Sequence, residues 1–173
     1  MTGSSPSKSA SISFHIDREY QRLVEKNQSP DTWLGTSIRV GDTFVVGDEK
    51  SGPKGSGCGV VLQLLESVRS ILEGERYIVE FENGPSWVVI EPQANGSVQI
   101  TRSVTWEGTT NPDKRLEIDT SRIVTAQAWI QAVRKSAQQF HEAIIDEFPE
   151  LADSDEMEQV RTEIDVVDGL SNG

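Results

Sequence analysis

The segment from Thr125 to Phe148 constrains the fold most, because its apolar residues recur at intervals of three or four positions. Such spacing places them on one side of a helix, and that side must be buried against another element. Thr125 is a suitable N-cap residue, and Pro149 ends the pattern. We therefore predict one long helix that lies across a sheet. Its apolar stripe comprises Ala126, Trp129, Ile130, Val133, Ala137, Phe140, Ile144 and Phe148.

Much of the remaining chain has the alternating pattern of strands joined by tight turns. Ile12, Phe14 and Ile16 alternate with polar residues, and Gly41-Asp42 separates two apolar runs at hairpin spacing. Strands are also predicted at 77–82, 87–90, 98–106 and 115–119, with turns at 83–85 and 95–96. Arg102 interrupts the apolar side of the strand at 98–106, which predicts a bulge or a position near the edge of the sheet. Two further helices are predicted at 17–26 and 60–72, with a glycine-rich loop at 48–59 before the second.

Together these patterns predict an α+β fold. A chain of 173 residues suits a single domain with its own core. We expect an antiparallel meander sheet packed on one face by two helices, at about 60–73 and 126–147. The predicted organisation is a disordered leader at 1–10, the α+β domain at 11–148, and an acidic, partly helical C-terminal tail at 149–173. In the tail, Asp153 and Glu156 have the spacing of a capping box, and a short acidic helix that frays at Gly169 is predicted. The apolar residues of its inner side are Met157, Val160, Ile164 and Val167. The leader has no apolar core, so we do not expect a signal peptide.

The composition excludes several functional classes. No long apolar run is present, so no membrane association is expected. The single cysteine, Cys58, rules out an internal disulfide and a multi-cysteine metal site. A net charge of −12 disfavours nucleic acid as a partner, because phosphate binding needs a basic face. We expect a cytoplasmic protein without a metal or a cofactor.

The negative charge is concentrated at the C-terminal end of the chain. Ten acidic residues and one base, Arg161, lie from Asp146 onward, so −9 of the net charge belongs to that part. A concentrated acidic surface speeds the encounter with a basic partner, whereas the alternative is a solvated extension that aids solubility. Trp33, in a turn-rich segment, is a candidate anchor for the same partner. The predicted partner-binding residues are Asp146, Glu147, Glu150, Asp153, Asp155, Glu156, Glu158 and Trp33.

A glycine-rich run, KGSGCG at 54–59, precedes a predicted helix. Glycines at such a position let backbone N–H groups approach a pyrophosphate at a helix N-terminus. The run KGSGCGVVLQLL resembles the acetyl-coenzyme-A-binding segment of the GNAT acetyltransferases. That resemblance implies an acyl-coenzyme-A-binding transferase in which Gly55, Gly57 and Gly59 bind the cofactor. The alternative is a loop that only connects the hairpin to the helix.

Few residues are suited to acid–base or nucleophilic chemistry. The two histidines, His15 and His141, lie on different predicted elements, and their spacing suggests no acidic partner. The helix N-terminus beside Cys58 would lower the pKa of its thiol and make it reactive, whereas the alternative is a small residue in a loop. Glu80, Glu82 and Glu91 are expected on a solvated face of the sheet. We predict no catalytic residues.

The order of elements from Thr36 to Leu151 comprises a hairpin, a helix ending in glycine, meandering strands and a long helix ending in Pro-Glu-Leu. This layout resembles small α+β immunity proteins that accompany bacterial polymorphic toxins. The resemblance implies a protein that binds and blocks a partner. We therefore predict a non-enzymatic protein-binding module that presents an acidic surface to a basic partner. The alternatives are the acyl-coenzyme-A-dependent transferase and a structural or oligomer-forming protein.

Overall fold

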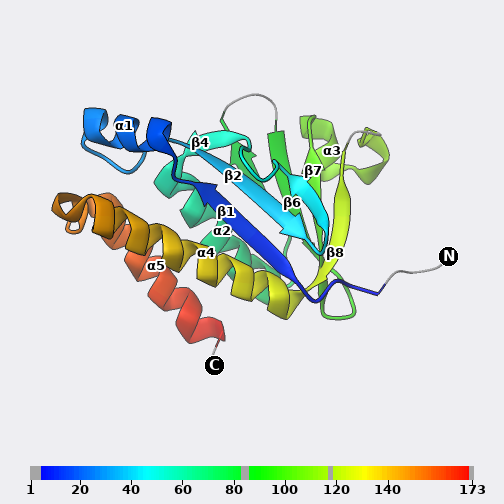
Figure 1. Ribbon diagram of the computed structural model, residues 1–173. Coiled ribbons are helices and arrows are strands. Elements are labelled where there is room, and N and C mark those ends of the chain that lie inside the picture. Colours follow the sequence, from blue (N-terminus) through cyan, green and yellow to red (C-terminus); the bar gives the residue numbers. More distant parts are fainter. Residues whose placement is uncertain (1–4, 83–85, 117–118, 172–173) are drawn as a thin grey trace.

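The computed structural model describes residues 5–82, 86–116 and 119–171 (Figure 1). The predicted α+β class is confirmed, with antiparallel strands packed against helices. The strands form two four-stranded sheets, one with the order β1-β2-β3 and β4 beside β2, the other with the order β5-β6-β7-β8. The elements are β1 (Ala10–His15), α1 (Arg18–Asn27), β2 (Trp33–Val40), β3 (Thr43–Val46), β4 (Lys54–Ser56), α2 (Gly57–Leu72), β5 (Tyr77–Phe81), β6 (Ser86–Pro92), β7 (Ser97–Ser103), α3 (Trp106–Thr110), η1 (Pro112–Lys114), β8 (Ser121–Thr125), α4 (Ala126–Glu147), η2 (Pro149–Leu151) and α5 (Asp155–Ser171).

The strand registers agree with the predicted hairpins. In the first sheet β2 pairs with β3 across Gly41-Asp42, and Gly41 has a φ of +59°, a conformation that suits glycine. In the second sheet β6 pairs with β7 across the predicted turn at Asn95-Gly96, where Gly96 has a φ of +80°. The turn predicted at 83–85 lies outside the described residues.

Three local predictions are wrong. The strand expected at 98–106 ends at Ser103. The described residues of the strand expected at 115–119 form no strand, and β8 begins only at Ser121. Between them lie α3 and η1, because the side chains of Thr105 and Asn111 accept backbone N–H groups at the starts of these helical turns. The predicted loop at 48–59 contains the short strand β4, and its last three residues form the first turn of α2.

The expected interruption at Arg102 is also absent from the sheet. We expected a bulge or an edge position there, but β7 lies between β6 and β8, and its register with β6 is unbroken from Trp87↔Ser103 to Pro92↔Val98. Arg102 is half-buried in this interior strand.

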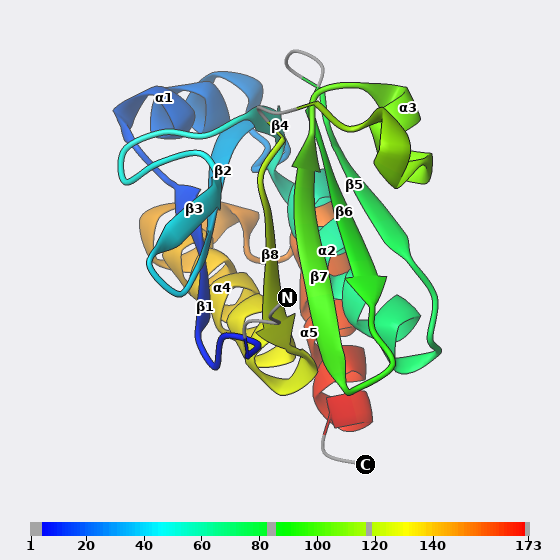
Figure 2. The same ribbon diagram turned by 90° about the vertical axis from the view of Figure 1, so that its right-hand side faces the viewer.

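The predicted long helix is confirmed as α4, with Thr125 as its N-cap. Helices α2 and α4 pack against one side of the sheets, and Figure 2 shows them behind the strands. Trp129 of α4 is completely buried, and its indole N–H donates to the hydroxyl of Ser67 on α2 over 3.3 Å. Phe140 packs edge-on against Phe14 of β1, with ring centroids 5.7 Å apart. The apolar stripe of α4 therefore joins both sheets and α2 in one core.

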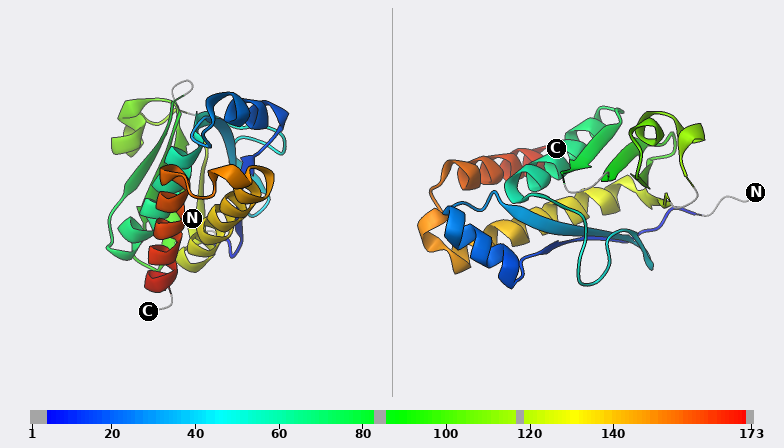
Figure 3. Two further views of the ribbon diagram at one scale, coloured as in Figure 1. Left: turned by 90° about the vertical axis from the view of Figure 1, so that its left-hand side faces the viewer. Right: turned by 90° about the horizontal axis from the view of Figure 1, so that it is seen from above.

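Helix α5 lies outside α2 and α4 and packs on both of them (Figure 3). The helix predicted in the C-terminal tail is present, but its start lies one residue later than the capping box predicted at Asp153 and Glu156. It begins at Asp155, and the cap is Ser154, which accepts the N–H of Met157. The helix continues through Gly169, where we expected it to fray. All four apolar residues predicted for its inner side are buried, and each such burial contributes about 1.5–3 kcal/mol. They are Met157, Val160, Ile164 and Val167.

The N-terminal segment also contributes to a sheet. Ser7, within the predicted leader, lies beside β8: its N–H donates to the Ile123 carbonyl, and its carbonyl accepts from the Thr125 N–H, both over 2.9 Å. Residues 1–4 lie outside the described part of the chain. Among the described residues no helix combines the length and the apolar character needed to cross a bilayer.

Candidate functional site

Exposed carboxylates gather where α4 ends, η2 turns the chain and α5 begins. This turn lies at the end of the molecule opposite the start of β1 (Figure 1). Phe148 and Leu151 are buried and fix the turn to the core, so the acidic residues between and beyond them are directed to solvent. We call this surface the acidic corner; it comprises Asp146, Glu147, Glu150, Asp153, Asp155 and Glu158, which are exposed, and Glu156, which is half-buried.

The carboxylates of the acidic corner have no ion-pair partner among the described residues. Asp155, Glu156 and Glu158 lie in the first turn of α5, where the helix dipole stabilises anions. Asp146 and Glu147 lie in the last turn of α4, which contains no base. There the dipole disfavours an anion by about 0.3–1 kcal/mol each. These two carboxylates therefore have no evident structural benefit.

The corner is not arranged as a metal site. Within the described chain no group of three or more histidine, cysteine, aspartate or glutamate side chains is positioned to hold a metal ion. The acidic side chains are spread along the outside of two helices, and this arrangement suits a broad contact with positive charges on another molecule.

Trp33, the other predicted partner-binding residue, belongs to a different surface. Its side chain is 43% exposed and lines a hollow of about 180 Å³. Glu19 and Lys54 line the same hollow and form an ion pair of 3.4 Å. None of the residues of the acidic corner lines this hollow. The structure therefore does not combine Trp33 and the acidic corner in one pocket.

His15 also lines this hollow and is held by a buried serine. The Nε2 atom of His15 lies 2.7 Å from Ser37 Oγ, and that hydroxyl lies 2.7 Å and 2.9 Å from the carbonyls of Asp48 and Ser51. Because carbonyls only accept, Ser37 donates its proton to them and accepts from His15. Nε2 therefore carries a proton and does not act as a base toward Ser37. This hydrogen bonding fixes the loop after β3 to β1 and β2.

The glycine-rich run at 54–59 packs so closely against neighbouring residues that two of its glycines leave no room for a side chain. A Cβ atom on Gly55 would lie 2.9 Å from a methyl group of Val60, and one on Gly57 would lie 2.8 Å from the Pro30 carbonyl. Both positions need glycine for packing alone. The backbone N–H of Gly57 donates to the carbonyl of Thr32 over 2.8 Å.

Carboxylates of the chain itself occupy two further N–H groups at the start of α2. Gly59 N–H donates to Asp31 over 3.3 Å, and Ser56 N–H donates to Glu82 over 3.4 Å. A pyrophosphate at this position would face two negative charges instead of free donors. The contacts of Gly55, Gly57 and Gly59 therefore favour the interpretation of a connecting segment.

Cys58 is not the reactive thiol that its position in the sequence suggested. The residue is buried at 3% exposure, and burial raises the pKa of its thiol, with the negative charges of Asp31 and Glu156 adding to the effect. Of the two interpretations, the reactive thiol is excluded because the side chain points into the core, where desolvation outweighs the dipole of the helix. Cys58 is a small residue, as the other interpretation has it, but it lies in the first turn of α2 and not in a loop.

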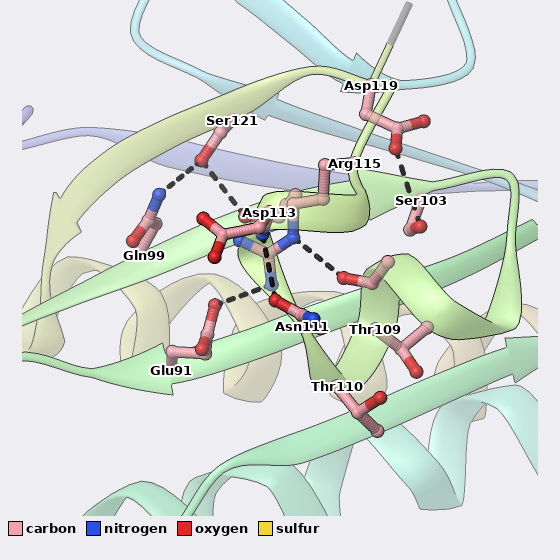
Figure 4. A network of polar contacts seen from close by, with 12 residues as sticks. Glu91, Gln99, Ser103, Thr109, Thr110, Asn111, Asp113, Arg115, Asp119 and Ser121 are labelled. Carbon is pink, nitrogen blue, oxygen red and sulfur yellow. Dashed lines mark hydrogen bonds and ion pairs between the residues drawn. The ribbon is translucent and has the colours of Figure 1, made fainter.

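A polar network that the sequence did not predict lies on the opposite face of the second sheet (Figure 4). Arg115 crosses this face: its Nε donates to the Gly108 carbonyl over 2.7 Å, and its Nη2 donates to Glu91 over 3.1 Å. Glu91 is thus an ion-pair partner, and its predicted solvated position is wrong. The pairing escaped sequence analysis because Arg115 follows two short helical turns that return the chain over the sheet.

The same network joins β7 to β8 and holds the described residues between these strands in place. The Asp119 carboxylate accepts from the backbone N–H groups of Val104 and Leu116, and the Gln99 side chain donates to Ser121 over 2.6 Å. Beside it, Trp106 is 55% exposed and packs edge-on against Trp87. These contacts hold α3 firmly on the sheet. They account for the conformation of residues 104–116 and 119–121 by contacts within the chain.

Comparison of the chain with protein-family models, curated proteins and solved structures finds no match. The chemistry of the exposed side chains and their placement on the fold are therefore the basis for the function proposed below.

Proposed function

We propose that this chain is a non-enzymatic protein-binding module that presents its acidic corner to a basic protein partner. The observation that carries the proposal is the position of Asp146 and Glu147. Both are exposed at the C-terminal end of α4, where the dipole disfavours anions, and neither forms an ion pair within the described chain. A basic partner would supply the missing positive charge.

The surroundings of the corner suit recognition. Buried Phe148 and Leu151 anchor the turn, so the carboxylates are held without a large loss of freedom on binding. Their shared charge raises the rate of encounter with a cationic surface, and salt weakens that attraction. A binding and blocking role, as in the immunity proteins that the layout resembles, follows as part of the same proposal.

The experiment that tests the proposal compares charge variants of the full chain as bait in a native lysate of the source organism. Asp146→Asn/Glu147→Gln removes two charges from the corner. The control, Glu73→Gln/Glu75→Gln, removes two exposed charges that follow the C-terminal end of α2. A basic protein captured by the wild type and the control, but lost by the corner variant, supports the proposal. Equal capture by all three baits contradicts it.

Truncation after Glu147 is not a suitable test, because it removes buried residues of α5 from the core. Loss of binding by that truncated chain would not separate loss of charge from loss of structure. The charge variants leave every buried side chain in place. The salt dependence of capture gives a second criterion, since an electrostatic contact weakens between 0.05 and about 0.5 M salt.

A further inference from the structure

The second sheet has two outer strands, β5 and β8, which are closed in different ways. The edge of β8 is covered by backbone, because Ser7 pairs with it. Within the described residues, strand β5 has only β6 as a hydrogen-bonded neighbouring strand. An outer strand exposes backbone N–H and C=O groups that can pair with another chain.

Gln63 of α2 occupies the exposed edge of β5 at Glu80. The Gln63 side chain donates from Nε2 to the Glu80 carbonyl over 3.2 Å, and its Oε1 accepts the Glu80 N–H over 2.9 Å. A primary amide has the same donor and acceptor as a peptide group. Gln63 therefore takes the position that one residue of an added strand would occupy.

The groups that Gln63 binds also show which residues face outward. Because outward and inward backbone groups alternate along an antiparallel strand, Ile78 presents its N–H and C=O to the same side as Glu80. Toward the end of β5, strand β4 approaches closely: a Cβ atom on Gly55 would lie 3.9 Å from Phe81 Cα. With Gln63 bound to Glu80, the outward backbone N–H and C=O of Ile78 are thus the part of the β5 edge that remains open.

The sequence of β5 makes such protection useful. The strand reads YIVEF, with no proline and one charge, and this composition favours strand addition. Two identical edges pair antiparallel around a two-fold axis, so a second copy of this chain is the occupant that fits this edge. Such pairing needs the outward backbone N–H and C=O groups of both Ile78 and Glu80 to be free.

We propose that the Gln63 side chain blocks the β5 edge, by binding its backbone groups, and so prevents pairing with a second copy of the chain. This role is independent of the acidic corner, because it concerns backbone groups on another part of the molecule. It also explains why a polar side chain of α2 is directed at the strand backbone.

The test is Gln63→Met, which keeps a side chain of similar length but removes both hydrogen bonds. Sedimentation of the full chain should show an average mass that rises with concentration above that of the wild type. Exchange of the Glu80 amide in dilute solution should accelerate by about tenfold, as expected for the loss of one backbone-protecting hydrogen bond. Gln138→Met, at an exposed position of α4, is the control for an added apolar side chain.

A second variant separates edge pairing from misfolding. Gln63→Met/Ile78→Lys places a positive charge at the open position of the β5 edge, and charged side chains on edge strands oppose pairing. Recovery of the wild-type mass supports the proposal. An unchanged mass in Gln63→Met overturns it, even if exchange at Glu80 is faster. Association that Ile78→Lys does not reverse, or that Gln138→Met reproduces, also overturns it.

Discussion

Two groups of acidic residues near the C-terminal end of the chain have opposite surroundings. Glu163 lies 3.0 Å from Arg69 of α2, and Asp168 lies 2.7 Å from Arg134 of α4. The acidic corner, at the end of α4, on the turn after it and at the start of α5, has no such partner among the described residues. Acids of the same type thus fasten one part of the segment to the fold and leave the other part charged and accessible.

The difference teaches that net charge alone does not identify a binding surface. The paired acids are partly buried and joined to the body by two arginines, so their charge is compensated locally. The charge of the corner is compensated only by solvent and salt. A surface available to a basic partner is therefore the part of the acidic segment that the rest of the protein does not use.

The largest expected effect comes from the inner side of α5. Val160 is completely buried, so Val160→Asp places an uncompensated charge in the core and should lower the free energy of unfolding by about 3–5 kcal/mol. Urea denaturation measures the loss. The control Gln159→Asp, on the exposed side of the same helix, should change stability by less than about 0.5 kcal/mol. A small effect of Val160→Asp would show that α5 is dispensable for the core.

An intermediate effect is expected from the ion pairs. Arg134→Met removes the partner of Asp168 and should lower the free energy of unfolding by about 0.2–1 kcal/mol, because both side chains remain partly exposed. Lys135→Met, an exposed neighbour without an ion pair in the described chain, should have less effect. A double-mutant cycle with Asp168→Asn isolates the pair. A coupling energy of zero would mean that the two groups of acids are equivalent.

Substitutions in the corner should change stability in opposite directions. Glu147→Gln relieves an unfavourable interaction with the dipole of α4 and should raise the free energy of unfolding by about 0.3–1 kcal/mol. Glu158→Gln, in the first turn of α5, should lower it by a similar amount. Both changes should shrink in 1 M salt. Two changes of the same sign would refute the assignment of Glu147 as a carboxylate kept at the expense of stability.

A pH-dependent effect is expected where α4 meets α5. Burial lowers the pKa of His141, and the positive charge of Arg161 lowers it further, although Glu142 and Asp165 oppose the shift. The unfolded chain therefore binds a proton more readily than the folded chain. The contribution to stability is complete above the ordinary histidine pKa of about 6.5 and is lost as the pH falls through the lower folded value.

Denaturation at pH 7.5 and at a series of lower values measures this contribution. His141→Gln should have a flatter dependence than the wild type in the range just below about pH 6.5. His15→Gln is the comparison, since it removes the other histidine of the chain. An equal slope for wild type and His141→Gln would exclude a role for this group.

Part of the fold could be predicted because its signals are local. The stripe of α4 and the inner side of α5 repeat with the helical period, and the turns at Gly41 and Gly96 need residues that tolerate a positive φ. The described residues between β7 and β8 were mispredicted because Val104 and Trp106 continue the alternation of β7. The caps at Thr105 and Asn111, together with the long-range pair of Arg115 and Glu91, outweigh that pattern.

The candidate site divides in the same way. The sequence by itself determined the acidic segment, the long helix and the class of fold, because charge and periodicity are properties of neighbouring residues. Only the tertiary structure decided which carboxylates are paired, that Cys58 points into the core, and that Gln63 meets the edge of β5. Those outcomes depend on contacts between residues far apart in the chain, whose distances are set by the packing of α2, α4 and α5 on the sheets.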